Sequence, residues 1–391
     1  MKILIIYPNS VYKSGAATNR VLSLARGLVE CGNVVHVIIS RPTENRGDSF
    51  GTSISGEICG VTFEYASQNL DWPRKKITRF LAMLKGHIYT LFKLLRIDSN
   101  DILISAATTS FTHNMNYAIL AKLMKWRFIH TLDEYPWVVL RRYDYSSVYR
   151  FLYLRYYYKL FDGFIVMTRS LIEYYKELAK RNALFIHIPM TVELDRFSIV
   201  SRANTFGNYI AYCGGDKLGN KDGIDILIRA FNLVKDEYPE INLLILGDVH
   251  PKIPKLIEEL SLEQRVAFLG FVDREEVPNY LMNAKALCLA RPDNKQSEGG
   301  FPTKLGEYLA SGRPVIVTDV GEISEYLTDG ESAYIAKADS IGDFAEKIRQ
   351  ALSNETRASE IGKAGRRVAE REFDYRKQGI VVDSVFRRIV K

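Results

Sequence analysis

The chain has 391 residues and a net charge of +7 at pH 7, with 47% hydrophobic and 25% charged residues. This length exceeds one ordinary α/β core and predicts two domains, and the composition is that of a globular protein. No stretch approaches the ~18 uninterrupted apolar residues of a transmembrane helix, and the apolar run at residues 3–7 is too short for a signal peptide. We therefore expect a cytoplasmic protein.

The cysteines and the positive charge narrow the function classes further. The cysteines lie far apart without C-x-x-C spacing, which argues against zinc and redox motifs and for reduced, buried thiols. They are Cys31, Cys59, Cys213 and Cys288. The charge favours an anionic partner, namely nucleic acid, a membrane surface or a phosphorylated substrate. Because the basic residues lie on helical stretches without a recognised nucleic-acid-binding module, we expect no nucleic acid partner.

The first half begins as a βαβ unit. Residues 2–8 form a continuous apolar run typical of a central parallel strand, helical spacing follows at 21–29, and residues 34–39 form the next strand. The unit lacks G-x-G-x-x-G and has no acid after its second strand, which argues against a nicotinamide dinucleotide site. Gly15, in the intervening loop, could let a substrate approach its backbone or could be a plain loop glycine.

Two stretches of the first half are rich in basic and aromatic residues. Residues 72–96 show a helical pattern of Lys, Arg and large apolar side chains, and residues 141–161 are rich in Tyr and Arg. Tyrosine prefers bilayer interfaces because its ring is apolar and its hydroxyl polar. Both stretches are typical of helices that contact a membrane surface. The alternative is that their apolar faces pack on the core and their basic faces are solvated.

Further strands are predicted at 101–105, 128–134, 163–168 and 185–189. Polar residues at the carboxyl end of a parallel strand point into the ligand crevice. His130 is such a residue. It could contact a substrate hydroxyl, relay a proton, or be a buried structural histidine.

Residues 198–207 are the candidate linker to a second α/β series. Strands are predicted at 209–213, 241–246, 266–270, 286–290 and 315–318, with helices starting near Gly223, Lys252, Arg274 and Thr303. Alternating strands and helices again predict a parallel, doubly wound sheet. More helices are expected near 341–352, 355–372 and 374–390, and the last could cross back onto the first domain.

The stretch from 297 to 318 carries the clearest chemistry and is expected to form a loop, a helix, a turn and a buried strand. The glycines at 299–300 let a ligand approach their backbone, and a proline suits the first turn of the helix. The amides of residues 303–305 would then face an anion, usually a phosphate. Lys304 adds positive charge, and Glu307 lies about one turn further on, where it can accept hydrogen bonds from nearby hydroxyls. A phosphate beside vicinal hydroxyls indicates a nucleotide diphosphate sugar.

Several segments together resemble the retaining family 4 glycosyltransferases (glycosyltransferase group 1), which have the GT-B fold. Residues 299–321 are similar to the donor-binding core, and residues 266–272 to the strand and loop beside the nucleotide base. Residues 189–197 are similar to the segment before the interdomain hinge, and residues 214–223 to the phosphate-binding start of the second domain. The resemblance implies an α/β protein with two tandem Rossmann-like domains and parallel sheets. An acceptor-binding domain is expected at 1–200, a donor-binding domain at 201–372, and a C-terminal helix that packs on the first domain at 373–391.

The resemblance also implies roles for single residues. Glu307 matches the second glutamate of the family's acidic motif, which holds the ribose hydroxyls, and Lys221 matches the lysine on the donor pyrophosphate. Gly15 would approach the phosphate or acceptor from the other domain, and His130 would lie near the transferred sugar. The candidate catalytic residues are Lys221, Glu298, Glu307 and His130, and the candidate donor-binding residues are Gly15, Gly215, Lys221, Phe271, Val272, Gly300, Phe301, Thr303, Lys304, Leu305 and Glu307.

Three departures from the family pattern concern this site. The first glutamate of the motif should stand at Gly299; Glu298 is one position early, so a bulge at the double glycine could let it reach the sugar. The family's arginine before the lysine is absent, and Lys304 could replace its charge because a point charge suffices for phosphate binding. Finally, Asp222 separates Lys221 from its glycine.

The implied activity is transfer of a hexose-like sugar from a nucleotide diphosphate sugar to a glycan or lipid-linked acceptor, with retention, in cell-surface polysaccharide or lipopolysaccharide synthesis. No Asp-x-Asp motif occurs, so neither a metal nor another cofactor is expected. Positive charges and the helix N-terminus would stabilise the leaving diphosphate. The protein would be cytoplasmic, and the membrane-surface interpretation adds a peripheral location at the inner face of the cytoplasmic membrane. Two alternatives stay open: a nucleotide-sugar 2-epimerase, and a non-catalytic nucleotide-sugar-binding subunit motivated by the missing glutamate and arginine.

Overall fold

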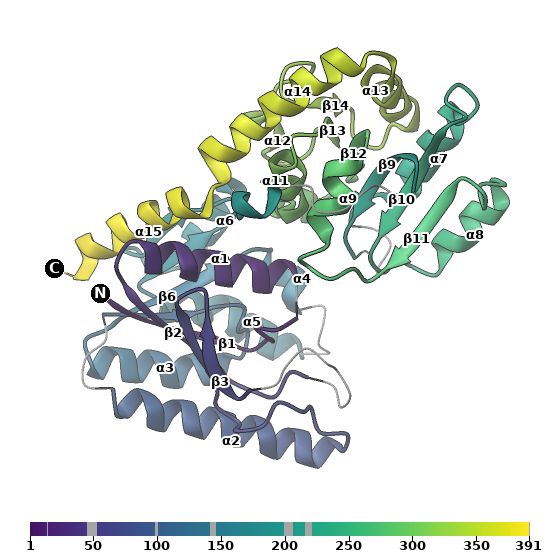
Figure 1. Cartoon of the computed structure of the whole chain (residues 1–391). Coiled ribbons are helices and arrows are strands. Elements are labelled where there is room, and N and C mark those ends of the chain that lie inside the picture. The colour runs from purple at the N-terminus through teal and green to yellow at the C-terminus, as the bar shows by residue number, and fades with distance from the viewer. Residues whose placement is uncertain are drawn as a thin grey trace. The chain divides into compact units, whose positions relative to one another are not determined.

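The computed structural model describes residues 1–13, 15–44, 53–97, 101–140, 146–198, 206–215 and 221–390. The chain divides into two compact units, one formed by Met1–Pro189 with Tyr375–Lys391 and the other by Met190–Asp374. Each unit is built on a mainly parallel sheet covered by helices, as the predicted fold class requires (Figure 1).

The division between the units differs from the expected boundary after residue 200. Residues 190–198 belong to the second unit, where the 3₁₀ turn Leu194–Phe197 is held by a hydrogen bond from the Arg366 guanidinium to the carbonyl oxygen of Phe197, at 3.0 Å. The C-terminal segment joins the first unit from Tyr375. Most of the candidate linker, 198–207, lies outside the described residues.

Within the described residues, the sheet of the first unit has the strand order β3-β4-β2-β1-β5-β6-β7-β8. Its neighbours pair in parallel, except that β3 forms an antiparallel hairpin with β4 at one edge. The apolar run at residues 2–8 forms β1, which is buried from Ile3 onward, as a central strand should be. The strands are β1 Lys2–Tyr7, β2 Val34–Ile39, β3 Ser55–Ile58, β4 Val61–Tyr65, β5 Ile102–Ser105, β6 Arg127–Leu132, β7 Gly163–Val166 and β8 Leu184–His187.

Helices cover both faces of this sheet. On one face, Val21 of α1 and Val382 of α15 share a core cluster with Ile3. The two helices meet closely, because a Cβ on Gly27 would lie 2.4 Å from the carbonyl oxygen of Tyr375. On the other face, α2 and α3 lie side by side (Figure 1). The helices are α1 Ala16–Glu30, α2 Lys76–Leu95, α3 Phe111–Leu123, α4 Pro136–Leu140, α5 Ser147–Tyr156, α6 Arg169–Leu178 and α15 Tyr375–Val390. The C-terminal helix therefore returns to the first unit, as predicted.

The second unit has a parallel sheet of strand order β11-β10-β9-β12-β13-β14 within the described residues. Its first five strands in chain order match the predicted ones to within a residue. The short β14 was not predicted, because three residues are too few for a period-2 pattern to appear. The strands are β9 Asn208–Cys213, β10 Ile241–Leu246, β11 Val266–Gly270, β12 Ala286–Leu289, β13 Val315–Thr318 and β14 Tyr334–Ala336.

The helices of the second unit lie between these strands and after them. They are α7 Ile224–Val234, α8 Lys252–Glu259, α9 Val277–Asn283, α10 Lys295–Gly299, α11 Thr303–Ala310, α12 Ile323–Tyr326, α13 Ile341–Ser353 and α14 Glu355–Val368. The predicted helix end at Gly312 is confirmed, since α11 stops just before it and Gly312 has the left-handed φ of 72° that terminates helices. Across both units, no helix in the described ranges combines the length and the hydropathy needed to cross a bilayer.

The four cysteines are free thiols, but they are not all buried as expected. Cys288 is buried and Cys31 and Cys213 are partly buried, whereas Cys59 is exposed. Cys59 lies in the turn between β3 and β4, where its φ of 51° and that of Gly60, 79°, reverse the chain. A hairpin turn faces solvent, so the apolar neighbours of Cys59 in the sequence do not bury it.

Candidate functional site

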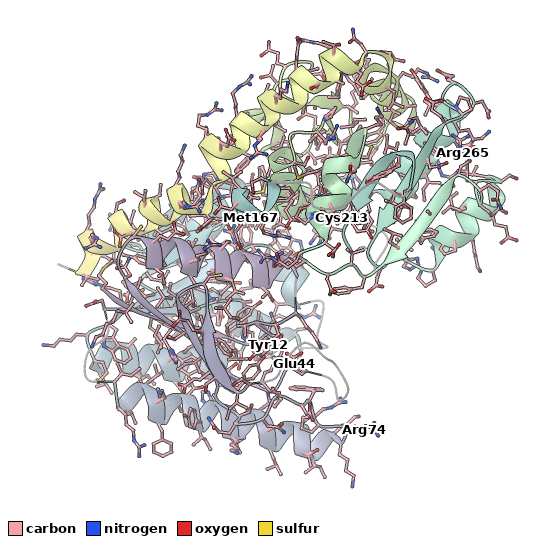
Figure 2. The ribbon with its side chains drawn as sticks, viewed as in Figure 1. Tyr12, Glu44, Arg74, Met167, Cys213 and Arg265 are labelled. Atoms are coloured by element: carbon pink, nitrogen blue, oxygen red, sulfur yellow. The ribbon has the colours of Figure 1, made fainter. Side chains whose placement is uncertain are left out.

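The candidate donor site lies at the topological switch point of the second unit. The chain runs from β9 to β10 and β11 on one side of the sheet and through β12 to β14 on the other, so β9 and β12 border the switch point. Open α/β sheets bind ligands at this position. Glycines crowd the backbone there: a Cβ on Gly247 would lie 2.5 Å from the carbonyl oxygen of Gly214, and the amide of Gly247 donates to the carbonyl of Gly270 at 2.6 Å. Cys213, at the end of β9, marks the place in Figure 2.

A buried carboxylate holds Lys304 at this point. The Lys304 Nζ lies 2.5 Å from Oδ2 of Asp222, and the Tyr212 hydroxyl donates to the same oxygen at 2.7 Å. The side chain of Asp222 is only 2% exposed. Burial by itself raises the pKa of Asp222, but the Lys304 charge and the two hydrogen bonds outweigh it and lower the pKa. Asp222 is therefore an ionised anchor for the Lys304 ammonium.

The path of the Lys304 side chain explains the glycine at 214. A Cβ on Gly214 would lie 1.6 Å from Cε of Lys304, and Gly214 has a φ of 155°, which side chains disfavour. Lys221 directly precedes Asp222 and is half-buried, and its contact with a pyrophosphate stays a prediction. Of the positions 214–216, where the family's arginine would stand, Asp216 lies outside the described residues, as do residues 217–220.

The N-terminus of α11 supplies fewer amides than expected. Pro302 is the N-cap residue and Thr303 begins the helix. The amide of Leu305 donates to the carbonyl oxygen of Pro302 at 3.0 Å, and the Leu305 side chain is fully buried. Leu305 therefore does not fit its predicted role, which leaves the amides of Thr303 and Lys304 as the candidate anion donors.

Glu307 is oriented by an arginine that lies far from it in the sequence. Nη1 of Arg196 lies 2.7 Å from Oε1 of Glu307, and Nη2 of Arg196 donates to the carbonyl of Arg274. The Arg274 guanidinium in turn pairs with Glu193 at 2.5 Å. Glu307 and Lys304 are three residues apart on α11, so their side chains share one face of the helix. The pairing engages Oε1 of Glu307, and the contact of Glu307 with ribose hydroxyls stays a prediction.

Glu298 is engaged with its own short helix. The Lys295 Nζ lies 2.6 Å from Oε2 of Glu298, on α10, and the Glu298 side chain is 38% exposed. The backbone beneath it is crowded, because a Cβ on Gly321 would lie 2.8 Å from the carbonyl oxygen of Ser297. The contact of Glu298 with the sugar stays a prediction.

The two residues before the helix are held from inside the unit. Nη1 of Arg291, whose side chain is buried, donates to the carbonyl of Gly300 at 2.6 Å. The Phe301 ring packs in the core against Tyr326 and Phe373, with ring centroids 5.4 and 5.6 Å away. The Phe301 side chain is thus structural, and of this residue only the backbone fits a donor-binding role.

The predicted base-binding residues follow β11. Phe271 is 56% exposed and comes directly after Gly270, whose φ of 63° turns the chain at the strand end. An exposed aromatic ring can stack on a nucleotide base. Val272 is half-buried. Gly215 has open space around it, since a Cβ there would meet nothing nearer than the carbonyl oxygen of Asp248, at 4.0 Å.

The sequence of this region matches a known family. Residues 202–368, which include the switch point, α10 and α11, match the family model described as glycosyl transferases group 1. Over residues 202–368 the chain is therefore similar to the group 1 glycosyltransferases. Among its relatives is an uncharacterised glycosyltransferase of Methanocaldococcus jannaschii, which is 26% identical over 277 residues, or 66% of this chain. That match spans 64% of the archaeal protein's own length.

Solved structures share the fold of this chain over nearly its whole length. Sucrose-phosphate synthase from Thermosynechococcus elongatus superposes with a TM-score of 0.75 at 18% identity, covering 99% of this chain and 98% of the other. HepE from Anabaena, solved in complex with UDP and glucose, has a TM-score of 0.70 at 15% identity and covers 99% of this chain and 100% of its own. Because the sequence identities are below 25%, this structural similarity establishes the GT-B fold alone.

Two predicted site residues lie in the first unit. Gly15 caps α1 with an extended φ of −175°, and a Cβ there would meet nothing within 4 Å. Neither the backbone conformation nor the packing requires glycine at this position, so its predicted approach to the ligand remains a prediction. His130 lies on β6 and is 4% exposed.

The surroundings of His130 favour a structural role over a catalytic one. Its Nδ1 lies 2.7 Å from the carbonyl oxygen of Ser105, its Nε2 3.4 Å from the Tyr157 hydroxyl, and its ring stacks on Phe161 with centroids 4.5 Å apart. Burial lowers the pKa of His130 to about 4, so the imidazole is neutral at pH 7. Of the alternatives stated above, the buried structural histidine fits this geometry.

We expect His130→Phe to affect stability and not turnover. The substitution removes the hydrogen bond between the imidazole and the buried carbonyl of Ser105, which costs about 1 kcal/mol. The pKa of His130 is lower in the folded than in the unfolded protein. The parent therefore has the full stability contribution of neutral His130 above the unfolded pKa and loses it as the pH falls toward 4. Thermal unfolding at pH 7 and pH 5, with kcat measured in parallel, checks this; a kcat lowered ~10²-fold in a folded variant would restore the catalytic role.

Sequence reasoning missed four residues of the site: Tyr212, Asp222 in its role as an anchor, Arg196 and Arg274. Asp222 was noted only as an extra residue before a glycine, although an acid beside Lys221 was a visible signal. Arg196 lies in a segment that the family resemblance covers, but nothing in the sequence links it to Glu307, 111 residues later.

Proposed function

We propose that this chain is a retaining glycosyltransferase that moves a sugar from a nucleotide diphosphate sugar to a glycan or lipid-linked acceptor. The observation that carries the proposal is the shared face of α11, where the anchored Lys304 and the oriented Glu307 lie beside the helix N-terminus at the switch point. A cation with helix amides suits a diphosphate, and a carboxylate one turn away suits the ribose hydroxyls. The complex of HepE with UDP and glucose supports this donor class.

In the proposed reaction, the bond between the anomeric carbon and the diphosphate oxygen breaks, and the acceptor oxygen bonds to the same face of that carbon. The acceptor proton passes to the departing phosphate oxygen. The negative charge of the leaving nucleoside diphosphate is met by Lys221, Lys304 and the amides of Thr303 and Lys304. These charges act where a metal would otherwise act, so we propose a metal-independent reaction.

Asp222 has a positioning role in this scheme. Its carboxylate is held ionised by Tyr212 and Lys304 and keeps the ammonium beside the start of α11 before the donor arrives. Preorganised charge needs little rearrangement when the leaving group develops its own charge. The four-carbon stem of Lys304 then lets Nζ contact both Asp222 and a phosphate oxygen.

A thermal-shift panel of nucleotide sugars tests the donor assignment. At a free concentration ~100-fold above Kd, a true donor adds about 2.7 kcal/mol to the free energy of unfolding. For a unit of this size that is a rise in Tm of ~5–10 °C. We expect one nucleotide series to stand out and EDTA to leave the shift unchanged. If no nucleotide diphosphate raises Tm, the donor site is wrongly assigned.

The second candidate is a non-catalytic nucleotide-sugar-binding subunit. Two observations favour it: Glu298 is paired with Lys295 within its own helix, and the charge of Lys304 is shared with Asp222. Product analysis by NMR with a donor that passes the thermal-shift screen separates the candidates. Transfer to an acceptor, or slow hydrolysis with retained configuration, supports the enzyme, whereas tight binding without turnover over an acceptor panel supports the subunit.

We place the reaction in the cytoplasm, at the inner face of the membrane, in the synthesis of a cell-surface polysaccharide or lipopolysaccharide. The basic, apolar surface of the first unit supports a lipid-linked acceptor, because such acceptors are presented at a membrane surface. The first unit would then supply the acceptor contacts.

A further inference from the structure

The helix α2 exposes its apolar face to solvent, unlike an ordinary amphipathic helix. Such helices bury their apolar stripe and expose their polar face. In α2 the buried residues are Gly86, His87, Thr90 and Leu94. Besides polar residues such as Lys76 and Lys85, large apolar residues of α2 are exposed. They are Ile77 at 75%, Phe80 at 65%, Leu81 at 54%, Leu84 at 42%, Ile88 at 43%, Phe92 at 58% and Leu95 at 54% exposure. The alternative that this apolar face packs on the core is therefore wrong.

The orientation of α2 is fixed by close packing on its small and polar side. A Cβ on Gly86 would lie 2.1 Å from the carbonyl oxygen of Ser40, so the helix backbone rests directly on the unit. The Thr90 hydroxyl donates within the helix to the carbonyl of Gly86 at 2.8 Å. Rotating α2 to bury its apolar stripe would lift Gly86 from this contact. The apolar stripe thus faces solvent as a consequence of how the helix is seated.

The apolar surface extends onto α3. The His87 ring stacks on His113 with centroids 4.0 Å apart, and the two ring nitrogens of His87 contact Tyr117 and Asn116, each at 3.0 Å. These contacts hold α2 and α3 side by side (Figure 1). The exposed apolar side chains of α3 recur every fourth residue, so they form one row along the helix: Met115 at 39%, Ile119 at 52% and Leu123 at 70% exposure. We call these residues and the exposed apolar residues of α2 the α2–α3 surface.

Cations border the α2–α3 surface and no carboxylate does so from α2 itself. No Asp or Glu occurs between residues 72 and 96, and the segment contains Arg74, Lys75, Lys76, Arg79, Lys85, Lys93 and Arg96. Arg74, exposed just before α2, is labelled in Figure 2. Lys93 pairs with Glu64 at 3.1 Å, and Arg79 lies over the Trp72 ring, while Lys85 lies beside Leu81, Leu84 and Ile88 around a shallow open hollow.

We propose that the α2–α3 surface docks on an anionic lipid bilayer. The exposed Ile, Leu and Phe side chains would enter the boundary between headgroups and acyl chains, and the bordering Lys and Arg would lie at the phosphate level. A second copy of the chain fits poorly, because face-to-face pairing would bring two sets of cations together without carboxylates between them. The proposal concerns the first unit and stands apart from the donor chemistry of the second.

Vesicle flotation of the full chain tests the docking. At ~0.1 M salt we expect the protein to float with vesicles of phosphatidylcholine containing about a third phosphatidylglycerol, and much less with pure phosphatidylcholine. At ~1 M salt, where the Debye length falls to ~3 Å, binding should weaken strongly. Absence of flotation with the anionic vesicles at low salt would overturn the proposal.

Two matched pairs of variants assign the binding to this surface. Leu81→Ser combined with Ile88→Ser should lower the partition coefficient at least ~10-fold, equal to about 1.4 kcal/mol, whereas Ile380→Ser on α15, 60% exposed, should not. Lys85→Glu with Arg96→Glu should abolish the preference for anionic vesicles, whereas Lys255→Glu on α8 should not. All positions are exposed, so Tm should stay near the parent value.

Other results of these experiments would contradict membrane docking by the α2–α3 surface or identify another occupant. If the Leu81 and Ile88 variants float like the parent, the α2–α3 surface is not the membrane contact. If sedimentation shows a dimer that the same variants dissociate, the occupant is a second copy. A chain that floats but shows no nucleotide-induced thermal shift would support docking while removing the proposed donor site, so the two proposals fail separately.

Discussion

Glu307→Ala is expected to lower kcat/KM for the nucleotide sugar at least ~10²-fold, comparable to the loss of one preorganised polar contact in other enzymes. The Ala variant removes the oxygen proposed to hold the ribose hydroxyls. It also leaves the Arg196 guanidinium, which is 9% exposed, without its carboxylate. Because Glu307 itself is 23% exposed, solvent screens part of this charge, and we expect a stability loss of about 1–2 kcal/mol.

Three comparisons separate ligand binding from orientation in this experiment. Glu307→Gln keeps the shape and should retain more stability than Glu307→Ala while still losing activity. Arg196→Lys keeps the charge but loses the two-pronged contact to Glu307 and to the carbonyl of Arg274, so it should raise KM more than it lowers kcat. Glu298→Ala, which removes a carboxylate from the neighbouring helix α10, is the matched comparison for Glu307→Ala. Donor affinity by calorimetry and steady-state rates provide the readout, and a Glu307→Ala variant with near-parent kcat/KM would remove Glu307 from the site.

Lys304→Ala is expected to lower both stability and turnover. Removing Lys304 leaves Asp222, 2% exposed, as a buried carboxylate that has lost its lysine and still accepts from the Tyr212 hydroxyl. Breaking a buried ion pair on one side costs about 3 kcal/mol, or ~6–12 °C in Tm for a unit of this size. Turnover should fall at least ~10²-fold, because the leaving diphosphate loses a cation.

The pH dependence of this loss has a defined sign. In the parent the pKa of Asp222 is lowered, so the pair stabilises the fold above the unfolded pKa of ~3.9 and the effect is lost as pH falls below it. In the variant, burial remains and raises the pKa. The ionised carboxylate then destabilises the fold at neutral pH, and protonation relieves it on acidification. The Tm difference between parent and variant should therefore be larger at pH 7 than at pH 5.

Two controls accompany the Lys304 experiment. The double variant Lys304→Ala with Asp222→Asn removes both charges and should recover much of the lost stability without recovering turnover. Lys295→Ala breaks a pair in which Lys295 is 72% exposed, so it should change the free energy of unfolding by less than ~0.5 kcal/mol. A Lys304→Ala variant as stable as the parent at pH 7 would mean that the Asp222 contact contributes nothing.

The two sheets, the segment at α11 and the resemblance to a family could all be read from the amino-acid sequence. Short, continuous apolar runs are typical of buried parallel strands, which is why β1, β2, β10 and β13 appear where they were predicted. The glycines, the proline and the charged residues around Thr303 follow local rules for helix ends, so the start of α11 and its stop before Gly312 could be read directly. These features depend on residues that are neighbours along the chain.

Which charges meet and which faces are buried became visible in the folded structure alone. Lys304 pairs with Asp222 across 82 residues and Glu307 with Arg196 across 111, and no local pattern encodes a contact at that separation. His130 was expected to be functional because it comes late in a predicted strand, but it lies within β6, where its ring stacks on Phe161 and contacts the carbonyl of Ser105. For α2 the periodicity showed an apolar stripe without its direction. Gly86 lets the backbone of α2 contact the backbone at Ser40, because glycine has no side chain to keep the two apart. With the Gly86 side of α2 against the unit, the apolar stripe faces solvent.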